Sequence, residues 1–368
     1  MTLSKYQCPR CHASDWRTYT SFWQCEPCGH QYPCTGGIPR LYVEKEVDQR
    51  DRALRDYFYN GLLGRFYRQM MPFLALPVRP GYWRGWLTYW LIIVALLGLI
   101  GLIGYRIVSL VQGNPILPAI DLPTLLVAVI LITFFARHRY LLWLLLLSVP
   151  TWLSLRSTKF RATTSFAEVH RHFIDELAAR GEKLQVLDIS TGTCNSLYRH
   201  GWMELDAEYT GLDLSETMLL QGRDFMAERR VPMDFVLGDA MQLPFAPDSF
   251  DVVLNYGALN GYGDTGRALA EMARVAKPGG LILILDEQLY PQATAIEHLY
   301  FHKVLSSHDI HDRFPVELLP PALTDVEVRQ IYHFYYLFTA RKPKARRGGS
   351  RVRKADAMAT SSPQSSER

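Results

Sequence analysis

Leu184-Gln-Val-Leu-Asp188-Ile-Ser190-Thr-Gly192-Thr-Cys194-Asn195 joins an apolar run to a loop of small residues, and a helical stretch follows. Strand and helix patterns alternate from Arg156 onward, which is typical of a doubly wound α/β fold with a parallel sheet. A strand-to-helix turn built from small side chains lets the backbone approach a ligand closely. The sequence therefore predicts a ligand site at the carboxyl end of strand 184–189.

Acidic and polar side chains end the next strands as well. Strand 209–214 reaches Asp213, strand 233–240 reaches Asp239, and strand 251–257 reaches Asn255 and Tyr256. Ligands of open α/β sheets bind outside the carboxyl ends of the strands, so we expect these side chains to share one crevice. An acid after the second strand can accept both ribose hydroxyls, and an acid after the third is placed for an adenine amino group. After helix 265–277 and strand 281–285, residues 326–332 and 333–341 are expected to complete the sheet as an antiparallel pair.

Four segments, "VLDISTGT", "GLDLSETML", "GDAMQLPFAPDSFDVVLNYGAL" and "ALAEMARVAKPGGLILILDE", resemble the class I S-adenosylmethionine-dependent methyltransferases. They are most similar to the branch that methylates quinones and other small molecules, and the similarity runs from about residue 160 to 340. The resemblance implies a Rossmann-like, seven-stranded domain that binds S-adenosylmethionine. The residues it implies for cofactor binding are Asp188, Ser190, Thr191, Gly192, Asp213, Leu214, Met218, Asp239, Ala240, Asn255 and Tyr256. This chain departs from the family at two loop glycines, which are Ser190 and Cys194 here.

Methyl transfer needs few catalytic side chains, because the sulfonium is an activated donor and in-line positioning supplies most of the rate. A base is required only when the acceptor loses a proton. Glu297, His298 and His302 fall on one face of a predicted helix, and this face favours a general base, a metal pair or a polar cap over the pocket. Further candidates are Asp286, Glu287, Tyr290, Tyr300, His308 and His311. We take His302, His298 and Tyr256 as the predicted catalytic residues.

Two CxxC pairs, Cys8/Cys11 and Cys25/Cys28, stand near the N-terminus. Two such turns can close a tetrahedral four-thiolate site, which predicts structural Zn; a redox dithiol would need a strand-helix context that is missing. Cys34 is either a spare thiol or a neighbouring ligand. Residues 6–43, with their "YP…GIP.L" ending, resemble the zinc-ribbon proteins that partner RNA and protein methyltransferases. We therefore assign residues 1–44 to a zinc ribbon.

Residues 45–84 read as an amphipathic linker helix, interrupted by Pro72, Pro77 and Pro80. This helix either packs on the catalytic domain or lies in a lipid headgroup region. Residues 85–105 are uncharged, and residues 116–136 carry only Asp121. Both runs are long enough to cross a bilayer, whereas residues 140–155 are short for a span. The segment 85–155 is thus predicted to be a membrane hairpin followed by an interfacial piece.

Charge sets the expected topology. Arginines precede the first apolar run and follow the second, while Arg106 stands alone near the turn, so both ends of the hairpin are expected in the cytoplasm. The absence of an apolar N-terminal run also argues against a signal peptide. Residues 341–368 hold nine Lys/Arg against two acids, although the whole chain is only +4. We expect this basic tail to be disordered, and its role to be solubility or attraction to anionic lipid.

Together these features predict a multi-pass membrane methyltransferase whose catalytic domain, residues 156–340, is cytoplasmic and acts on a small lipophilic acceptor. The alternatives are methylation of RNA or protein, as zinc ribbons and a basic tail suggest, and a non-catalytic scaffold. The intact acids Asp188, Asp213 and Asp239 argue against a scaffold. A nucleic-acid partner is disfavoured because the excess basic charge lies in the tail, and the sequence gives no indication of a protein partner.

Overall fold

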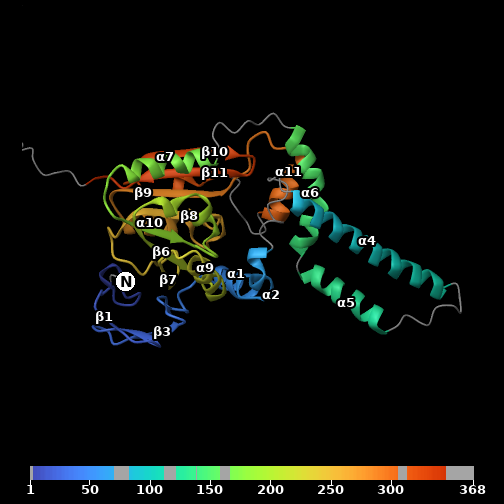
Figure 1. Cartoon of the computed structure of the whole chain (residues 1–368), viewed down its shortest axis with the longest axis horizontal. Coiled ribbons are helices and arrows are strands. Elements are labelled where there is room, and N and C mark those ends of the chain that lie inside the picture. Colours follow the sequence, from blue (N-terminus) through green and yellow to red (C-terminus); the bar gives the residue numbers. More distant parts are fainter. Residues whose placement is uncertain are drawn as a thin grey trace, which may run out of the picture.

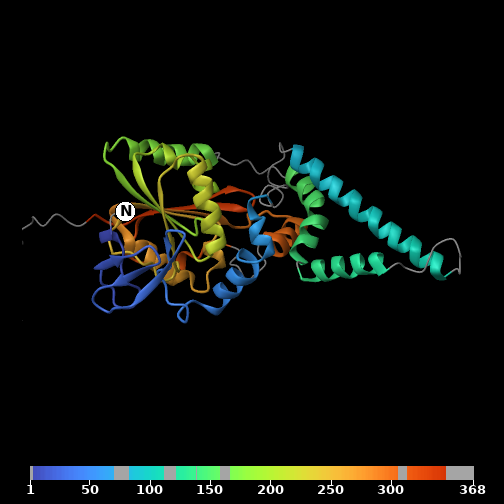
Figure 2. The same cartoon turned by 60° about the horizontal axis from the view of Figure 1, so that its bottom comes forward.

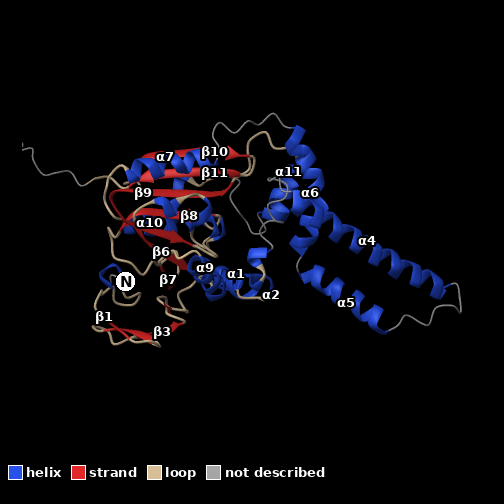
Figure 3. Cartoon of the chain, viewed as in Figure 1, coloured by secondary structure: helices blue, strands red, loops and turns tan. Residues whose placement is uncertain are grey.

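The computed structural model describes residues 3–69, 83–111, 122–137, 139–157, 166–305 and 313–344. Its body is a seven-stranded sheet in the order β10-β11-β9-β8-β5-β6-β7 (Figure 3). Strands β5 to β9 are parallel, and β11 and β10 are added antiparallel at one edge. This confirms the predicted α/β fold. The strands are β5 (Leu184–Ile189), β6 (Ala207–Asp213), β7 (Met233–Leu237), β8 (Phe250–Tyr256), β9 (Ala276–Glu287), β10 (Thr324–Tyr332) and β11 (Tyr335–Arg341).

Helices cover both faces of the sheet, because its central strands are apolar on both sides. Along β8, Val253 packs with α10, whereas Val252 and Leu254 pack with α7 and α9. The alternation of side chains along a strand thus divides the core into two layers. The covering elements are α7 (Phe166–Ala178), α8 (Asn195–Arg199), η3 (Trp202–Glu204), α9 (Glu216–Glu228), η4 (Leu259–Gly261), α10 (Thr265–Val275) and η6 (Val316–Leu318).

The N-terminal module is a small four-stranded sheet beside β7 (Figure 1). It comprises η1 (Leu3–Lys5), β1 (Trp16–Thr18), β2 (Phe22–Cys25), β3 (Gln31–Thr35) and β4 (Ile38–Pro39). The backbone N–H of Leu41 donates to the carbonyl of Leu237 at 2.7 Å, and Lys5 Nζ donates to Asp234 at 3.0 Å. Tyr6 is fully buried in one cluster with Phe245. The module therefore shares a core with the α/β body.

The linker after this module packs on the α/β body in its described part. It forms α1 (Gln49–Leu54), η2 (Arg55–Tyr59) and α2 (Leu62–Arg65). The amide Nε2 of Gln221, on α9, donates to the carbonyl of Gly64 at 2.9 Å. Packing on the domain, rather than in lipid headgroups, accounts for this part of the amphipathic pattern. The prolines expected to interrupt the helix lie outside the described residues.

Three helices follow, where the sequence predicted a two-helix hairpin and an interfacial piece. They are α4 (Trp83–Val111), α5 (Leu122–Arg137) and α6 (Arg139–Ser157). Helix α4 and helix α5 extend away from the α/β body in both views (Figures 1 and 2). Helix α6 packs against α11 (Ala295–Tyr300) and η5 (Phe301–Leu305), with Leu144 and Leu147 in one buried cluster with Tyr300 and Phe301. The third apolar run is therefore a docking helix of the catalytic domain.

The predicted multi-pass membrane topology is contradicted. Among the residues that the structure describes, no helix combines the length and the apolar character needed to cross a membrane. Helix α5 has 16 residues. At 1.5 Å per residue it extends about 24 Å, less than a hydrocarbon core of about 30 Å. Helix α6 buries Leu144, Leu147 and Leu155 on protein, whereas Leu146 and Leu153 are exposed. The turn between the two runs, and the tail from residue 345, lie outside the described residues.

Candidate functional site

A pocket opens at the carboxyl end of the parallel strands, at the edge where the sequence predicted a ligand site. The strand order reverses between β5 and β8, and ligands of open α/β sheets bind at such a switch point. Loops after β5, β6, β7 and β8 form its floor, and the linker helices form its other wall. Its lining residues are Asp51, Leu54, Arg55, Tyr59, Tyr67, Ser190, Gly192, Asp213, Leu214, Ser215, Met218, Gly238, Asp239, Ala240, Tyr256, Gly257, Ala258, Gly261 and Tyr262.

The loop after β5 is held in a left-handed backbone conformation at three positions. Ser190, Gly192 and Cys194 have φ of 55°, 53° and 58°. Ser190 and Cys194 are the two places where the resemblance implies glycine, which adopts this conformation without steric cost. The backbone geometry is thus retained although the residues differ. Gly222 of α9 allows the close packing beneath the loop, since a Cβ there would lie 2.8 Å from the carbonyl oxygen of Gly192.

Asp188 ends β5 in a buried position and carries one free acceptor atom. The Thr191 hydroxyl donates to its Oδ2 at 2.6 Å. Its Oδ1 has no hydrogen-bond partner within the described part of the chain. Burial raises the pKa of Asp188 to about 7. A buried acceptor without a donor is costly, so this atom fits a site completed by a donor group of a bound ligand.

Asp213 organises the pocket floor from the end of β6. Its Oδ2 accepts from the backbone N–H of Gly192 at 2.9 Å, and its Oδ1 accepts from that of Ser215 at 2.8 Å. Burial raises its pKa to about 6. Leu214 and Met218 line the pocket beside it. The first two predicted strand-end acids are therefore joined through one loop, by Thr191 and Gly192.

The ends of β7 and β8 supply the remaining predicted cofactor residues. Asp239 Oδ1 accepts from the backbone N–H of Met241 at 2.8 Å, and burial raises the Asp239 pKa. Asp239, Ala240 and Tyr256 all line the pocket. Asn255 is fully buried and donates from Nδ2 to the Tyr262 hydroxyl at 2.8 Å. Its Oδ1 has no partner among the described residues.

Tyr256 is predicted to be catalytic, and its hydroxyl accepts a hydrogen bond from Trp202 Nε1. Burial raises the pKa of Tyr256 well above its ordinary value. The His200 ring stacks on the Tyr256 ring at a centroid distance of 5.1 Å. The Tyr256 hydroxyl is thus hydrogen-bonded to Trp202 of the same chain, which suits a role in shaping the pocket wall.

His298 and His302 lie elsewhere. They are on α11 and η5, both are exposed, and their ring centroids are 6.2 Å apart. Neither belongs to the described residues that line the pocket. Glu297, which was expected on the same helix face, is instead fully buried and accepts from the Tyr290 hydroxyl at 2.8 Å. A catalytic role for the two histidines stays a prediction without support from this geometry. His308 and His311 lie outside the described residues.

Sequence reasoning missed the wall formed by the linker. Asp51, Tyr59 and Tyr67 line the pocket. Asn60 Oδ1 accepts from the Ser215 hydroxyl at 2.7 Å, which joins η2 to the N-terminus of α9. The signal available was the density of tyrosines with acids between residues 51 and 67, since a helix that only packs on a core seldom needs so many polar rings.

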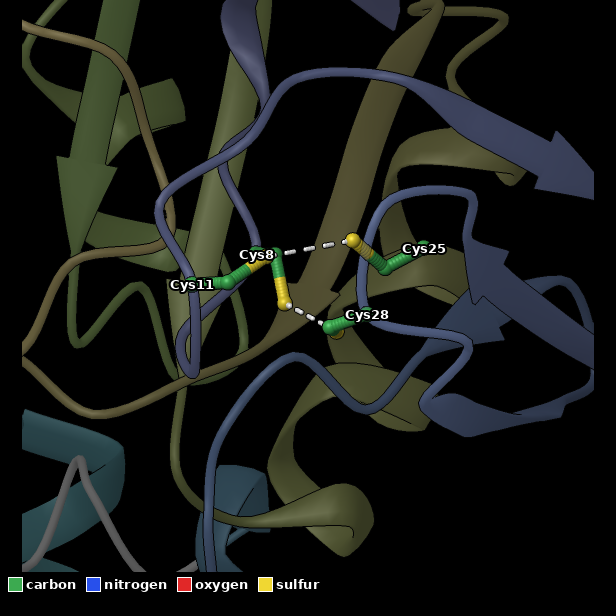
Figure 4. A group of neighbouring side chains, drawn as sticks. All are labelled: Cys8, Cys11, Cys25 and Cys28. Carbon is green, nitrogen blue, oxygen red and sulfur yellow. Dashed lines mark hydrogen bonds between the residues drawn. The ribbon is translucent and has the colours of Figure 1, made fainter.

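The four predicted metal ligands are brought together. The ligand atoms of Cys8, Cys11, Cys25 and Cys28 all lie within 4.8 Å of one another (Figure 4). The Sγ atoms of Cys8 and Cys28 are 3.7 Å apart, and those of Cys11 and Cys25 are 3.4 Å apart. Each pair sits in a similar turn, with the N–H of the fourth residue after the first cysteine donating to that cysteine's carbonyl. The arrangement is compatible with Zn; Cys34 is not part of the cluster.

This cysteine cluster also contacts the pocket floor. Gln242 Nε2 donates at 3.2 Å to the carbonyl of Pro9, which lies between the first two cysteines. The backbone N–H of Gln242 in turn donates to the Asp239 carbonyl at 3.1 Å. Gln242 thus connects the turn that carries Cys8 and Cys11 to the loop that carries Asp239.

Comparisons with known proteins agree with this geometry. The family described as "Methyltransferase domain" matches residues 187–284. A demethylmenaquinone methyltransferase of Renibacterium salmoninarum is 40% identical over 102 residues, which cover 28% of this chain and 40% of the relative. A ubiquinone/menaquinone biosynthesis C-methyltransferase of Cereibacter sphaeroides is 40% identical over 125 residues, covering 32% and 48%. A phthiotriol/phenolphthiotriol dimycocerosates methyltransferase of Mycobacterium ulcerans is 46% identical over 83 residues, covering 22% and 29%.

The chain spans less than half the length of these curated relatives. The match to the family runs from within β5 to within β9 and includes Asp188, Asp213 and Asp239. The sheet order, the loop after β5 and the placement of Asp188, Asp213 and Asp239 are the features that the resemblance implied. The comparisons thus identify a methyltransferase domain over residues 187–284 and support the resemblance to the class I S-adenosylmethionine-dependent methyltransferases.

Proposed function

We propose that this protein methylates a small lipophilic acceptor, of the quinol or phenol type, with S-adenosylmethionine as donor. The observation that carries the proposal is that Asp213 and Asp239, after neighbouring strands, line one pocket and each accept from a backbone N–H. The buried Asp188 lies behind them and accepts from Thr191 of the loop after β5. When bound, S-adenosylmethionine supplies the methyl group on an activated sulfonium. The relatives named for quinones and phthiotriols support an acceptor of this class.

The chain's own residues would bind and orient the cofactor. Asp213 would accept the ribose hydroxyls while keeping its bonds to the loop after β5. Asp239 and Ala240 would meet the adenine edge. The unpaired oxygens of Asp188 and Asn255 would accept from a donor group on the methionine side. Their positioning would supply most of the rate, because held reactants lose little further entropy in the transition state.

The linker wall supports a lipophilic, ring-shaped acceptor. Tyr59, Tyr67 and Tyr262 all line the pocket, and the Tyr262 hydroxyl contacts that of Ser190 at 2.7 Å. Aromatic side chains offer large apolar faces together with hydroxyl groups, and they pack well on other rings. We propose that the acceptor ring lies between these tyrosines.

We also propose a structural role for Zn at the four cysteines. Zn²⁺ bound by four thiolates has no open coordination position, so it would hold the module in shape and take no part in methyl transfer. The 3.4–3.7 Å Sγ separations of the two close pairs support this assignment.

Tritiated methyl transfer tests the acceptor class. The full chain is incubated with labelled S-adenosylmethionine and with lipid, RNA and protein fractions of the host. Label in the lipid fraction, lost in an Asp213→Ala variant, is expected. Label mainly in RNA or protein contradicts the acceptor class. No label and no cofactor binding by calorimetry would favour a scaffold.

A further inference from the structure

Glu287 is an acidic residue directly behind the pocket-lining Gly257, and the proposed cofactor site does not use it. It is the last residue of β9, beyond the level at which Leu285 pairs with Tyr256 of β8. A Cβ built at Gly257 would lie 3.8 Å from Glu287 Oε1, and Gly257 lines the pocket. Gly257 has φ of 70°, which favours glycine. The absence of a side chain there brings the Glu287 carboxyl next to the pocket.

Its neighbour Asp286 has a different, structural role. Asp286 is fully buried, its Oδ2 accepts from the backbone N–H of Asn260 at 2.9 Å, and its Oδ1 accepts from that of Glu287 at 2.8 Å. Asn260 Nδ2 also donates to the Glu287 carbonyl at 2.6 Å. The backbone at Glu287 is therefore held from two sides, while its side chain is only partly buried. This is the support that a reacting side chain needs.

The electrostatic environment suits a base. Burial, and next the nearby charge of Asp286, raise the pKa of Glu287 well above its ordinary value. An effective general base has a pKa near the operating pH, which an ordinary glutamate does not. Burial is also the main cause that raises the pKa values of Tyr59 and Tyr67, and the charges of both Asp213 and Glu287 contribute. Tyr59 and Tyr67 are thus close both to Asp213, the acid proposed to bind the cofactor ribose, and to Glu287.

We propose that Glu287 accepts the hydroxyl proton of the methyl acceptor, with Tyr59 and Tyr67 beside the ring. This inference rests on the function proposed above and adds its proton acceptor. The O–H proton passes to the Glu287 carboxylate, and the ring carbon next to that oxygen attacks the methyl carbon. A C–C bond forms as the S–CH₃ bond breaks, which releases S-adenosylhomocysteine. The ring C–H proton then leaves to water, and Glu287 returns its proton to the oxygen. One proton is released in all.

The pH profile of a Glu287→Gln variant tests the proposal. The probe is a 2-prenyl-1,4-naphthohydroquinone kept reduced, and kcat is measured with saturating S-adenosylmethionine from about pH 5 to pH 9, the range in which a tuned carboxyl titrates. We expect a fall in kcat of about 10²–10³-fold and loss of the low-pH limb that the proposal predicts for the wild type. The KM for S-adenosylmethionine should stay within twofold of the wild-type value. The melting temperature should stay within a few degrees of it.

Glu327→Gln serves as the matched control, because Glu327 is an exposed acid on β10, at the far edge of the sheet. It should change neither kcat nor the pH profile. A Glu287→Asp variant keeps a carboxyl and should retain the low-pH limb at reduced kcat. A merely structural Glu287 would instead lower the melting temperature in both variants and leave the profile in place.

The outcomes separate the two proposals. If the wild type methylates simple phenols but not the prenyl probe, the acceptor is of the phenol type and not the quinol type, and the same pH profiles of the Glu287 variants are then measured with the phenol. If Glu287→Gln keeps at least a third of kcat with the wild-type profile, the base assignment is overturned while the proposed function stands. If the wild type binds the cofactor but methylates no hydroxylated ring, both proposals fall.

Discussion

Substitution of Asp213 by alanine tests the cofactor site most directly. In the free protein, the two Asp213 oxygens accept from the N–H groups of Gly192 and Ser215 at 2.9 and 2.8 Å. Alanine leaves these two donors without their acceptor and removes the acceptor proposed for the ribose hydroxyls. The loop after β5 then loses one of its bonds to the end of β6, while the bond from the N–H of Thr191 to the carbonyl of Leu212 remains.

The magnitude follows from the bonds that would be lost. A hydrogen bond to a charged group contributes about 1.5–3 kcal/mol. Since about 1.4 kcal/mol corresponds to a tenfold change in affinity, loss of one ribose bond already predicts at least tenfold weaker binding of S-adenosylmethionine. Asp213→Asn should weaken binding less, because its amide oxygen still accepts one bond. Its NH₂ group, however, must face a backbone N–H, so it should not equal the wild type.

Calorimetric titration of the full chain with S-adenosylmethionine and with S-adenosylhomocysteine measures the effect. Circular dichroism verifies that the fold is retained, which we expect because Asp213 is at a strand end. Asp224→Ala on α9 is the control, since Asp224 contacts the exposed side chain of Arg223 and is remote from the pocket lining. Wild-type affinity in the Asp213→Ala protein would refute the assignment of the ribose site to this residue.

Three further predictions concern protons, metal and the linker. Burial raises the pKa values of Asp213 to about 6 and of Asp188 to about 7, and the cofactor needs their ionised forms, so its affinity should increase as pH rises from about 5 to 8 in calorimetric titrations. Cys25→Ser in the full chain should reduce bound Zn and lower the melting temperature of the whole protein; full Zn content by metal analysis would contradict the four-ligand site. Asn60→Ala removes the acceptor of the Ser215 hydroxyl, a bond worth about 1 kcal/mol, and should raise the KM for S-adenosylmethionine about fivefold, whereas an unchanged KM would mean that the linker does not close the site.

The sheet and the pocket floor could be predicted because their signals are local. Asp188, Asp213 and Asp239 each follow an apolar strand, and parallel strands bring such ends to one edge whatever the rest of the chain does. The backbone conformation at Ser190 and Cys194 was not readable in the same way. Both residues have side chains, and only the surrounding contacts hold them at positive φ. Local rules therefore located the site but not all of its geometry.

The position of the linker against the pocket could not be predicted from local sequence patterns. An amphipathic pattern tells which face of a helix is covered, but not what covers it. The bond from Ser215 to Asn60 joins residues 155 positions apart, and nothing in either neighbourhood indicates the other. The same limit explains why the apolar run in α6 was assigned to lipid. Its leucines pack on Tyr300 and Phe301, and an apolar protein surface and a bilayer select the same side chains.

The cysteine module shows the same limit of local sequence patterns for a whole structural unit. The spacing of two CxxC pairs predicts a compact metal turn by itself, and it suggests a unit that folds alone. The structure buries Tyr6, Trp23 and Tyr32 in one cluster with Phe245 and Phe250 of the catalytic body. Separated from that body, the module would expose these rings to water. If the cysteines bind metal and the pocket binds the cofactor, both ligands would act on this shared core, and a ligand that binds only the folded state stabilises that state.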